Sequence, residues 1–327
     1  MSERRPALAV RARGLVKRYG ATTALAGIDF EVPTGTVTAV LGPNGAGKTT
    51  AIRILTTLAD ADEGEAVVAG FDVARDPGEV RRRIGLAAQD ATVDPLLTGR
   101  ENLVMLGELH QQSRRAAKDR AALLLEEFSL VDAADRVTSG YSGGMRRRLD
   151  LAATLVSDPE VLFLDEPTTG LDPRARAELW SVLDGLVERG RTVLLTTQYL
   201  DEAERLADDI IVVDHGRIIA RGDARKLKRE VGGDHLNVVV AEADDLDDAA
   251  RLVAKVAGAE PHIDVEARSL SVPIGNGIDT LLDTAKALAK AQIAVEDLSL
   301  HQPSLDEVFL TLTGSPPEDE STEENDR

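Results

Sequence analysis

Residues 42–49 of this 327-residue chain, Gly-Pro-Asn-Gly-Ala-Gly-Lys-Thr, match the phosphate-binding pattern G-x-x-x-x-G-K-[ST] at every constrained position. An apolar run typical of a buried strand, Val37–Leu41, precedes the pattern, and a helical stretch follows it, which is the context that the pattern requires. Glycines let the backbone turn its N–H groups toward phosphate oxygens, and the start of the following helix favours an anion. Lys48 is expected to contact the β- and γ-phosphates, and the Thr49 hydroxyl to bind Mg²⁺. This loop predicts a P-loop nucleotidase without saying which kind, and its expected nucleotide-binding residues are Gly42, Asn44, Gly45, Gly47, Lys48, Thr49 and Thr50.

An apolar run that ends in two acids supplies the expected second half of the site. Residues 161–166 read Val-Leu-Phe-Leu-Asp-Glu, so Asp165 stands at the end of a predicted strand, where it is placed to hold Mg²⁺, usually through water. Successive side chains of a strand point to opposite faces, and Glu166 can then polarise the water that attacks the γ-phosphate. The alternative is a strand that simply emerges into solvent, and the P-loop weakens it because a P-loop needs such an acid.

The order of apolar runs predicts an α/β domain over residues 8–222. Short β-branched runs alternate there with helical stretches, which is typical of an α/β sandwich with a mainly parallel core sheet. The strand signal disappears between about residues 96 and 157, so this segment is expected to be a helical insertion. The expected strands are 37–41, 66–68, 161–164, 192–196 and 210–213, and the expected helices are 48–58, 101–110, 115–128, 144–156, 174–189 and 201–207.

A small C-terminal α+β domain is expected over residues 232–314. Gly232-Gly233 marks a plausible boundary, and the elements beyond it follow the order β-α-β-β-α-β, which is typical of a ferredoxin-like fold. The tail at 315–327 is rich in Pro and acidic residues and is expected to be disordered. The expected strands are 236–240, 262–265, 269–272 and 293–299, and the expected helices are 245–256 and 277–291.

Composition excludes several classes of function. The chain has no cysteine, which excludes a disulfide framework, a Cys-ligated zinc site and thiol catalysis. No apolar run approaches the roughly 20 residues that span a bilayer, and the N-terminus lacks the apolar core of a secretory signal. A net charge of −19 would repel nucleic acid and anionic lipid headgroups. We therefore expect no nucleic-acid partner, and membrane contact only through another protein.

Residues 141–145, Tyr-Ser-Gly-Gly-Met, resemble the LSGGQ signature of ABC ATPases. The Ser-Gly-Gly centre is kept, whereas Tyr141 replaces Leu and Met145 replaces Gln. A serine hydroxyl and glycine N–H groups at the start of a helix form a second anion site. The resemblance implies that the fold is a P-loop ABC ATPase domain with a helical insertion and that the nucleotide is ATP. It also implies a homodimer on ATP binding, in which Ser142, Gly143 and Gly144 of one protomer close on the ATP held by the P-loop of the other.

Other ABC elements follow in order along the chain, and the resemblance assigns their roles. Tyr19 matches the aromatic residue that stacks on adenine, the alternative being a core tyrosine, and Asp172 matches the D-loop at the dimer interface. Gln89 matches the Q-loop glutamine, which senses Mg²⁺ and water. Where ABC ATPases usually carry a histidine, this chain has Gln198, which can donate a hydrogen bond to the γ-phosphate but cannot become cationic. The implied catalytic residues are Glu166, Gln198 and Gln89, and the implied metal ligands are Thr49, Gln89 and Asp165.

Two runs, 196–203 and 305–314, are similar to the ATPases of daunorubicin-resistance-type drug exporters. The similarity implies a peripheral subunit at the cytoplasmic face of the cell membrane. This subunit would power efflux of an amphiphilic drug or lipid through a separate integral membrane permease of the ABC-2 type. Residues 97–103 resemble the segment near which such a permease docks.

Other ABC proteins and other P-loop proteins remain as alternatives. The runner-up is the ATPase of an importer or of another ABC-2 exporter, for polysaccharide or ions, although the many short strands of an importer's regulatory domain are lacking. A chromosome-structure ATPase would need a long coiled coil, and a translation-associated ABC protein would need two ATPase domains in one chain. A GTPase would need an N-K-x-D motif. The sequence shows none of these three features.

Overall fold

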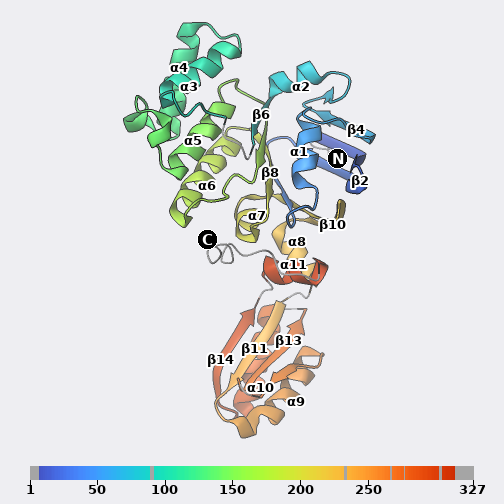
Figure 1. The fold of residues 1–327 in the computed structure, drawn as a ribbon. Coiled ribbons are helices and arrows are strands. Elements are labelled where there is room, and N and C mark those ends of the chain that lie inside the picture. The colour runs from blue at the N-terminus through green and yellow to red at the C-terminus, as the bar shows by residue number, and fades with distance from the viewer. Residues whose placement is uncertain are drawn as a thin grey trace, which may run out of the picture. The chain divides into compact units, whose positions relative to one another are not determined.

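The computed structural model describes residues 7–88, 92–231, 234–265, 267–275, 277–301 and 304–313. They form two compact units, which divide between Arg221 and Gly222 and are described separately below (Figure 1). Three expectations from the sequence fall outside the described residues: the Gln89 site, the Gly232-Gly233 boundary and the acidic tail at 315–327. Within the described part of the chain, no helix has both the length and the apolar character needed to cross a bilayer.

The first unit contains a six-stranded sheet, in which β9 and β8 run parallel to β3, β7 runs parallel to β8, and β6 runs parallel to β7. Every residue of β3, β7 and β8 is buried, which explains why these strands are largely apolar in sequence. The expected α/β fold is thereby confirmed. In spatial order, the strands are β10 (Arg217–Gly222), β9 (Asp209–Asp214), β3 (Val37–Leu41), β8 (Thr192–Thr197), β7 (Val161–Asp165) and β6 (Ile84–Ala87).

The register of this sheet brings three chain segments together at one edge. Leu41 at the end of β3 pairs with Thr197 at the end of β8, and Asp165 at the end of β7 pairs with Thr196. The P-loop after β3, the two acids at the end of β7 and the segment after β8 therefore leave the sheet side by side. Ligands of parallel α/β sheets bind at such carboxyl ends.

A second, antiparallel sheet packs over the first. Its order is β2 (Thr22–Pro33), β1 (Leu8–Tyr19), β4 (Glu63–Val68) and β5 (Phe71–Asp72). The expected strand at 66–68 is confirmed as part of β4, and it lies in this antiparallel sheet, where Ala66 pairs with Ala12. The first half of β4 is exposed and its second half is buried at alternate residues, so its short apolar run gives no hint of an antiparallel partner.

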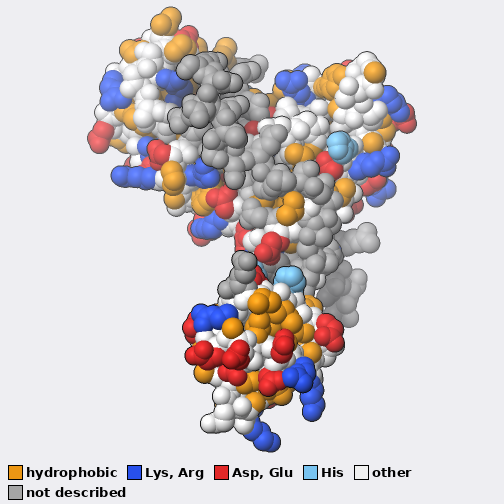
Figure 2. Space-filling view, turned by 60° about the horizontal axis from the view of Figure 1, so that its bottom comes forward, with side chains coloured by type: hydrophobic (Ala, Val, Ile, Leu, Met, Phe, Trp, Pro, Cys, Tyr) orange, Lys and Arg blue, Asp and Glu red, His pale blue; other side chains and the backbone are white. Residues whose placement is uncertain are grey.

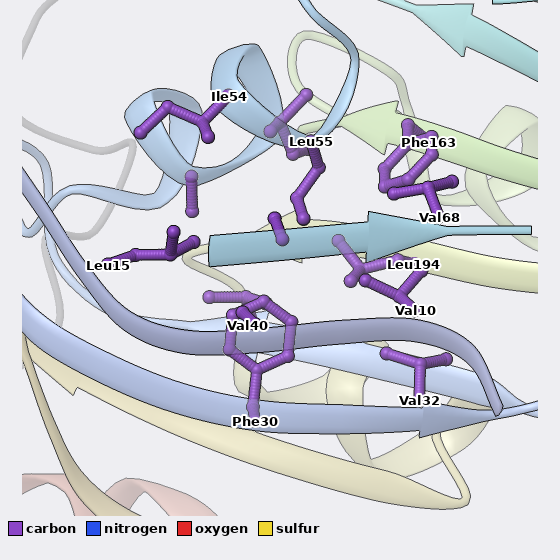
Figure 3. Close-up of a cluster of buried hydrophobic side chains, with 14 of the residues drawn as sticks. Val10, Leu15, Phe30, Val32, Val40, Ile54, Leu55, Val68, Phe163 and Leu194 are labelled. Carbon is purple, nitrogen blue, oxygen red and sulfur yellow. The ribbon is translucent and has the colours of Figure 1, made fainter. Parts of the chain in front are cut away.

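The hydrophobic core of this unit lies between the two sheets and α1 (Lys48–Leu55) (Figure 3). Val10 and Phe30 from the antiparallel sheet and Val40 and Phe163 from the parallel sheet point into it, and Ile54 joins them from α1. All five side chains are at most 3% exposed. The helix that follows the P-loop is thus held by its apolar face, which fixes the loop at its start. The other helices around this body are α2 (Pro77–Arg83), α6 (Pro173–Glu188) and α7 (Leu200–Leu206).

The segment expected to be a helical insertion consists of α3 (Gly99–Leu109), α4 (Arg114–Glu127) and α5 (Gly143–Thr154), with short 3₁₀ turns at Val131–Ala133 and Thr138–Gly140. Helix α3 begins two residues before the expected start at 101. Its N-cap is Thr98, whose hydroxyl accepts a hydrogen bond from the Glu101 N–H, while the Glu101 carboxylate accepts one from the Thr98 N–H. This capping box satisfies the free N–H groups of the first turn.

The second unit contains a sheet with the order β12 (His262–Asp264), β13 (Ser269–Ile274), β11 (Asp234–Val240) and β14 (Val295–His301), with antiparallel neighbours throughout. Helices α9 (Leu246–Ala257) and α10 (Gly277–Lys290) share its hydrophobic core, and the 3₁₀ turn Ala243–Asp245 precedes α9. The expected element order β-α-β-β-α-β is present. Helices α8 (Ala224–Val231) and α11 (Leu305–Thr313) contact each other and belong to this unit, so it begins ahead of residue 232.

Candidate nucleotide-binding and hydrolysis site

The P-loop wraps around the side chain of its own lysine. Lys48 is 4% exposed, and its ammonium donates hydrogen bonds to the carbonyl oxygens of Gly42 (2.8 Å) and Pro43 (3.2 Å). Gly47, the N-cap of α1, has φ 108°, and a Cβ there would lie 2.4 Å from the Ala24 carbonyl oxygen, so only glycine fits. No side chain caps the start of α1. The N–H groups of its first turn and its positive dipole end are therefore available to an anion.

The two acids after β7 take different partners, as the alternation of the strand predicts. Asp165 is 3% exposed, and its Oδ1 accepts hydrogen bonds from the hydroxyls of Thr49 (3.2 Å) and Thr196 (2.5 Å). The Glu166 carboxylate lies instead 3.3 Å from the Lys48 ammonium. The structure thus brings Lys48, Thr49, Asp165 and Glu166 together at the carboxyl end of the sheet.

Glu166 has a backbone conformation that residues other than glycine rarely adopt. Its φ is 47°, in the left-handed region, where a bulky residue is strained. The Glu166 N–H donates to both the carbonyl oxygen and the hydroxyl of Thr196, each at 3.1 Å, and these bonds help to hold the strained turn. Such strain persists only where the surroundings fix it, and it is concentrated at functional sites.

The residues around Asp165 suit Mg²⁺. A carboxylate and a hydroxyl 3.2 Å apart are hard oxygen donors, which Mg²⁺ prefers. Among the described residues, no group of three His, Asp or Glu side chains is close enough to bind a metal without help. Mg²⁺ is commonly held by one or two protein ligands together with substrate phosphates and water.

The signature residues lie in a separate groove. Ser142 is the N-cap of α5, and its hydroxyl accepts a hydrogen bond from the Met145 N–H (3.3 Å). Asp172 caps α6 in the same way, accepting from the Ala175 N–H (2.8 Å). Both residues line a groove of about 360 Å³ together with Gly143 and Gly144. The described residues that line this groove come from within 142–148 and 170–178, and none belongs to the P-loop.

The remaining candidate residues lie around these two centres. Tyr19 ends β1 and is 47% exposed, which rules out the alternative of a core tyrosine. Asn44 and Gly45 are exposed on the P-loop, and Thr50 is half-buried in the first turn of α1. Gln198 follows β8 and is half-buried, and its buried side-chain oxygen has no hydrogen-bond partner among the described residues. Gln89 lies outside the described residues.

Tyr141, which replaces the usual leucine of the signature, is anchored through its hydroxyl. The ring is buried, and the hydroxyl donates to the Ala133 carbonyl oxygen (2.7 Å), while burial raises the pKa of the phenol. Gly99, the first residue of α3, lies against this hydroxyl, and a Cβ added there would be only 2.4 Å from it. The tyrosine therefore joins the signature to the first turn of α3.

Three residues of the site were missed by reasoning from the sequence. Thr196 bonds to Asp165, Arg147 bonds to the backbone after β7, and Glu202 in α7 is fully buried behind the segment after β8. Thr196 is an ordinary strand residue in sequence, Arg147 is one of three consecutive arginines, and Glu202 is one of several acids in its helix. Nothing in their sequence positions marks them as partners of the site.

The Glu202 carboxyl group lies among polar groups from three other segments: α6, the end of β8 and the chain just after β7. Trp180 of α6 donates its indole N–H to Glu202 Oε1 (3.4 Å). Burial is the dominant influence and raises the pKa of Glu202 from 4.5 to about 7, although hydrogen bonds from Thr197, Thr168 and Trp180 act to lower it. Within the part of the chain that the structure describes, Glu202 Oε2 and the Thr168 hydroxyl each lack a partner with good hydrogen-bond geometry, so the buried carboxylate is only partly stabilised.

This buried acid makes stability depend on pH. Between pH 4.5 and 7 the folded chain binds more protons at Glu202 than the unfolded chain, so the free energy of unfolding falls as pH rises through this window. Glu202→Gln removes the effect. Denaturant titration measures the difference in the free energy of unfolding between Glu202→Gln and wild type. As the pH rises from 4.5 to 8, this difference should shift by about 3 kcal/mol in favour of the variant. Fluorescence of Trp180, the single tryptophan, should titrate near pH 7 in wild type only.

A matched control is available on the same helix, because Glu204 is exposed. Glu204→Gln should keep both the pH dependence of stability and the titration of Trp180 fluorescence. A pH profile of Glu202→Gln that runs parallel to that of wild type would show that folding does not raise the pKa of Glu202, contrary to this prediction.

The first centre is a lysine and two acids at the carboxyl end of a parallel sheet, and the second is a Ser-Gly-Gly helix start on a helical insertion. Together on this fold they define a P-loop ATPase of the ABC type. Comparison with known proteins agrees. The sequence family described as "ABC transporter" matches residues 25–169. The chain belongs to the ATP-binding subunits of ABC transporters, within the group that includes the daunorubicin-resistance ATP-binding proteins, and it is an ATPase subunit of an ABC exporter.

Similar proteins cover nearly the whole chain. The daunorubicin resistance ATP-binding protein DrrA2 of Streptomyces coeruleorubidus is 54% identical, covering 94% of this chain and 95% of that protein. The doxorubicin resistance ATP-binding protein DrrA of Mycobacterium tuberculosis is 45% identical, with 95% of each covered. A Nod factor export ATP-binding protein I of Burkholderia orbicola is 39% identical, covering 92% of this chain and 96% of that protein.

Solved structures match the first unit in size. An ATP-binding subunit of an ABC transporter aligns with a TM-score of 0.61 and 27% identity, covering 68% of this chain and 92% of that one. A dimeric ATP-binding cassette in a post-hydrolysis state with bound ADP and Pi aligns with a TM-score of 0.60 and 25% identity, covering 65% of this chain and 98% of that one.

Proposed function

We propose that two copies of this chain close head to tail around two ATP molecules with Mg²⁺, and that closure drives an ABC-2-type permease that exports an amphiphilic drug or lipid. The observation that carries the proposal is the separation of the two anion sites. The P-loop and the signature line different places on one chain, whereas a C2 dimer presents the signature of each protomer to the P-loop of the other. The similar cassette that was solved as a dimer with ADP and Pi supports a dimer as the nucleotide-bound form.

The roles of the residues follow from their positions. Lys48 would bind the terminal phosphates, and Thr49 and Asp165 would hold Mg²⁺, which supplies positive charge to the phosphate oxygens. Glu166 would orient the attacking water and accept its proton, and Gln198 would donate a hydrogen bond to the γ-phosphate. Ser142, Gly143 and Gly144 of the partner would bind the same phosphate at a helix start.

Export is supported by the relatives, whose names divide between daunorubicin or doxorubicin resistance and Nod factor export. Attachment to a protein rather than to lipid is supported by the charge of −19. Among the described residues on the face seen in Figure 2, basic side chains are interspersed with acidic ones and form no continuous basic surface of the kind that binds nucleic acid or anionic lipid. We therefore place the chain at the cytoplasmic face of the membrane, held by its permease.

Membrane attachment provides the test. We expect the chain to sediment with membranes only when an ABC-2-type permease is co-expressed, and the same cells to gain daunorubicin tolerance that Lys48→Ala abolishes. The purified chain should stay in the supernatant when it is mixed with anionic phosphatidylserine vesicles at physiological salt. Strong binding to these vesicles without a permease would refute attachment through protein. Attachment to the permease without any gain in tolerance would refute daunorubicin as a cargo, while the permease would still be supported as the partner.

A further inference from the structure

Helix α5, which begins at the signature, carries a half-buried arginine that binds the backbone around the hydrolytic acids. The Arg147 guanidinium donates hydrogen bonds to the carbonyl oxygens of Pro167 (2.7 Å), Glu166 (3.1 Å) and Asp165 (3.2 Å). A further N–H donates to the Ala88 carbonyl oxygen (3.0 Å), just beyond the end of β6. The planar guanidinium presents its donors in a fixed fork, so one side chain can hold several acceptors in a set geometry.

Asp150, one turn further along α5 than Arg147, binds the backbone at Thr92 and Val93. It is 5% exposed, and its Oδ1 accepts hydrogen bonds from the N–H groups of Thr92 (2.9 Å) and Val93 (3.3 Å). Residues at i and i+3 lie on the same face of a helix, so Arg147 and Asp150 act from one side of α5. Together they bind Ala88 on one side of residues 89–91 and Thr92 and Val93 on the other.

Both charges are kept in the interior at a cost. Burial lowers the pKa of Arg147 and raises the pKa of Asp150, and each group partly restores the charged form of the other. A buried charge is tolerated when its hydrogen-bonding groups are satisfied. Here the partners are backbone groups of the segments that carry the site, and not the side chains of a surface ion pair.

The hydrogen bonds of Arg147 help to fix the strained turn at Glu166, and thereby the position of its carboxylate. Glu166 has φ 47°, and its own carbonyl oxygen, with those of both neighbours, is held by Arg147. Thr196 holds the N–H of Glu166 from the other side. If the guanidinium is lost, the turn can relax toward an unstrained conformation, and the carboxylate moves with it.

We propose that Arg147 and Asp150 are positioning residues, through which α5 links the signature to the backbone of Glu166 and to both sides of residues 89–91. Engagement of Ser142 at the start of the helix then sets the position of the hydrolytic carboxylate. The proposal rests on the function as an ATPase. Neither residue needs to touch the nucleotide.

Substitution of Arg147 tests this proposal in the full-length chain. Arg147→Gln should lower kcat for ATP about 10- to 100-fold, the range expected when a catalytic group is misplaced by about 1 Å. KM for ATP, and the affinity for a fluorescent ATP analogue measured without turnover, should stay within about threefold of wild type, because the P-loop is intact. Arg147→Lys should show the same split, since a single ammonium cannot reach the Ala88 and Pro167 carbonyl oxygens together.

Arg120→Gln is the matched control. Arg120 of α4 is also half-buried and donates to a backbone carbonyl oxygen of the α5 end, that of Leu155 (2.6 Å), far along the helix from the signature. It should lose a similar amount of thermal stability while keeping kcat within about twofold of wild type.

Three results would overturn the proposal: unchanged kcat in Arg147→Gln, a parallel loss of nucleotide affinity and kcat, or an equal loss of kcat in Arg120→Gln. If Arg147→Gln does not fold, Arg147→Lys decides by the same measurements. The same measurements separate the positioning role from the ATPase function. A wild-type chain without ATPase activity would refute the ATPase function, whereas equal activity in wild type and variant would refute only the positioning role.

Discussion

Glu166→Gln should lower steady-state ATP hydrolysis by about 10²- to 10⁴-fold, the contribution typical of a general base, while ATP binding is retained. The amide has the size of the carboxylate but cannot accept a proton from water. Lys48, whose ammonium lies 3.3 Å from the Glu166 carboxylate, should then bind phosphate without a competing acid, so ATP binding should be equal or tighter. An ATP-bound dimer should therefore accumulate. Phosphate release measures the loss of hydrolysis, and light scattering with ATP measures the dimer.

Glu160→Gln is the matched control for this experiment. Glu160 directly precedes β7, at the opposite end of the strand from Glu166, and its side chain is 63% exposed beside Arg83. It should hydrolyse ATP like wild type and should not accumulate as a dimer. Normal turnover in Glu166→Gln would remove Glu166 from the chemistry and direct attention to another base.

Lys48→Ala should weaken nucleotide binding itself, lowering affinity for ATP by about 100-fold or more. A buried ammonium that makes charge-assisted hydrogen bonds to phosphate contributes about 3 kcal/mol or more, and each 1.4 kcal/mol is a factor of ten. The loss also leaves Glu166, whose side chain is only 10% exposed, without its cation beside an incoming anion. Titration with a fluorescent ATP analogue measures the change.

Lys286→Ala, in the second unit, controls for loss of a positive charge, because this exposed lysine pairs only with the nearby Asp283 among the ion pairs of the described residues. Its ATP affinity should equal that of wild type. If Lys48→Ala binds ATP normally yet fails to hydrolyse it, the lysine acts on the reaction and not on binding, contrary to this prediction.

The parts of the site that were predicted from sequence share one property, which is that each is read within a few residues. The P-loop and the pair Asp165-Glu166 each combine an apolar strand with the polar residues that directly follow it. The side chains that complete the site come from other elements. Arg147 reaches Glu166, 19 positions along the chain, and Thr196 reaches Asp165, 31 positions away. Single-sequence patterns carry no information about such distant pairs.

The fold shows the same limit. Strands buried on both faces were predicted well because they are nearly continuous apolar runs. The long strands β1 and β2 were not predicted, because charged residues occupy their exposed face and irregular register interrupts the alternation near Gly14. Helix α8 was not among the expected helices, since charged residues make up most of it and Leu227 is its one buried apolar anchor within the described side chains.

The contact between Tyr141 and Gly99 has a consequence for how such proteins diverge. The large residue occupies the space that a side chain at position 99 would need, so the two positions form a size-complementary pair 42 residues apart. An exchange at one position alone leaves either a void or a collision, whereas a coordinated exchange preserves the packing. Along a lineage, the first residue of α3 and the first residue of the signature should therefore change together. A chimaera that imports a leucine-type signature should import its matching residue at position 99 as well.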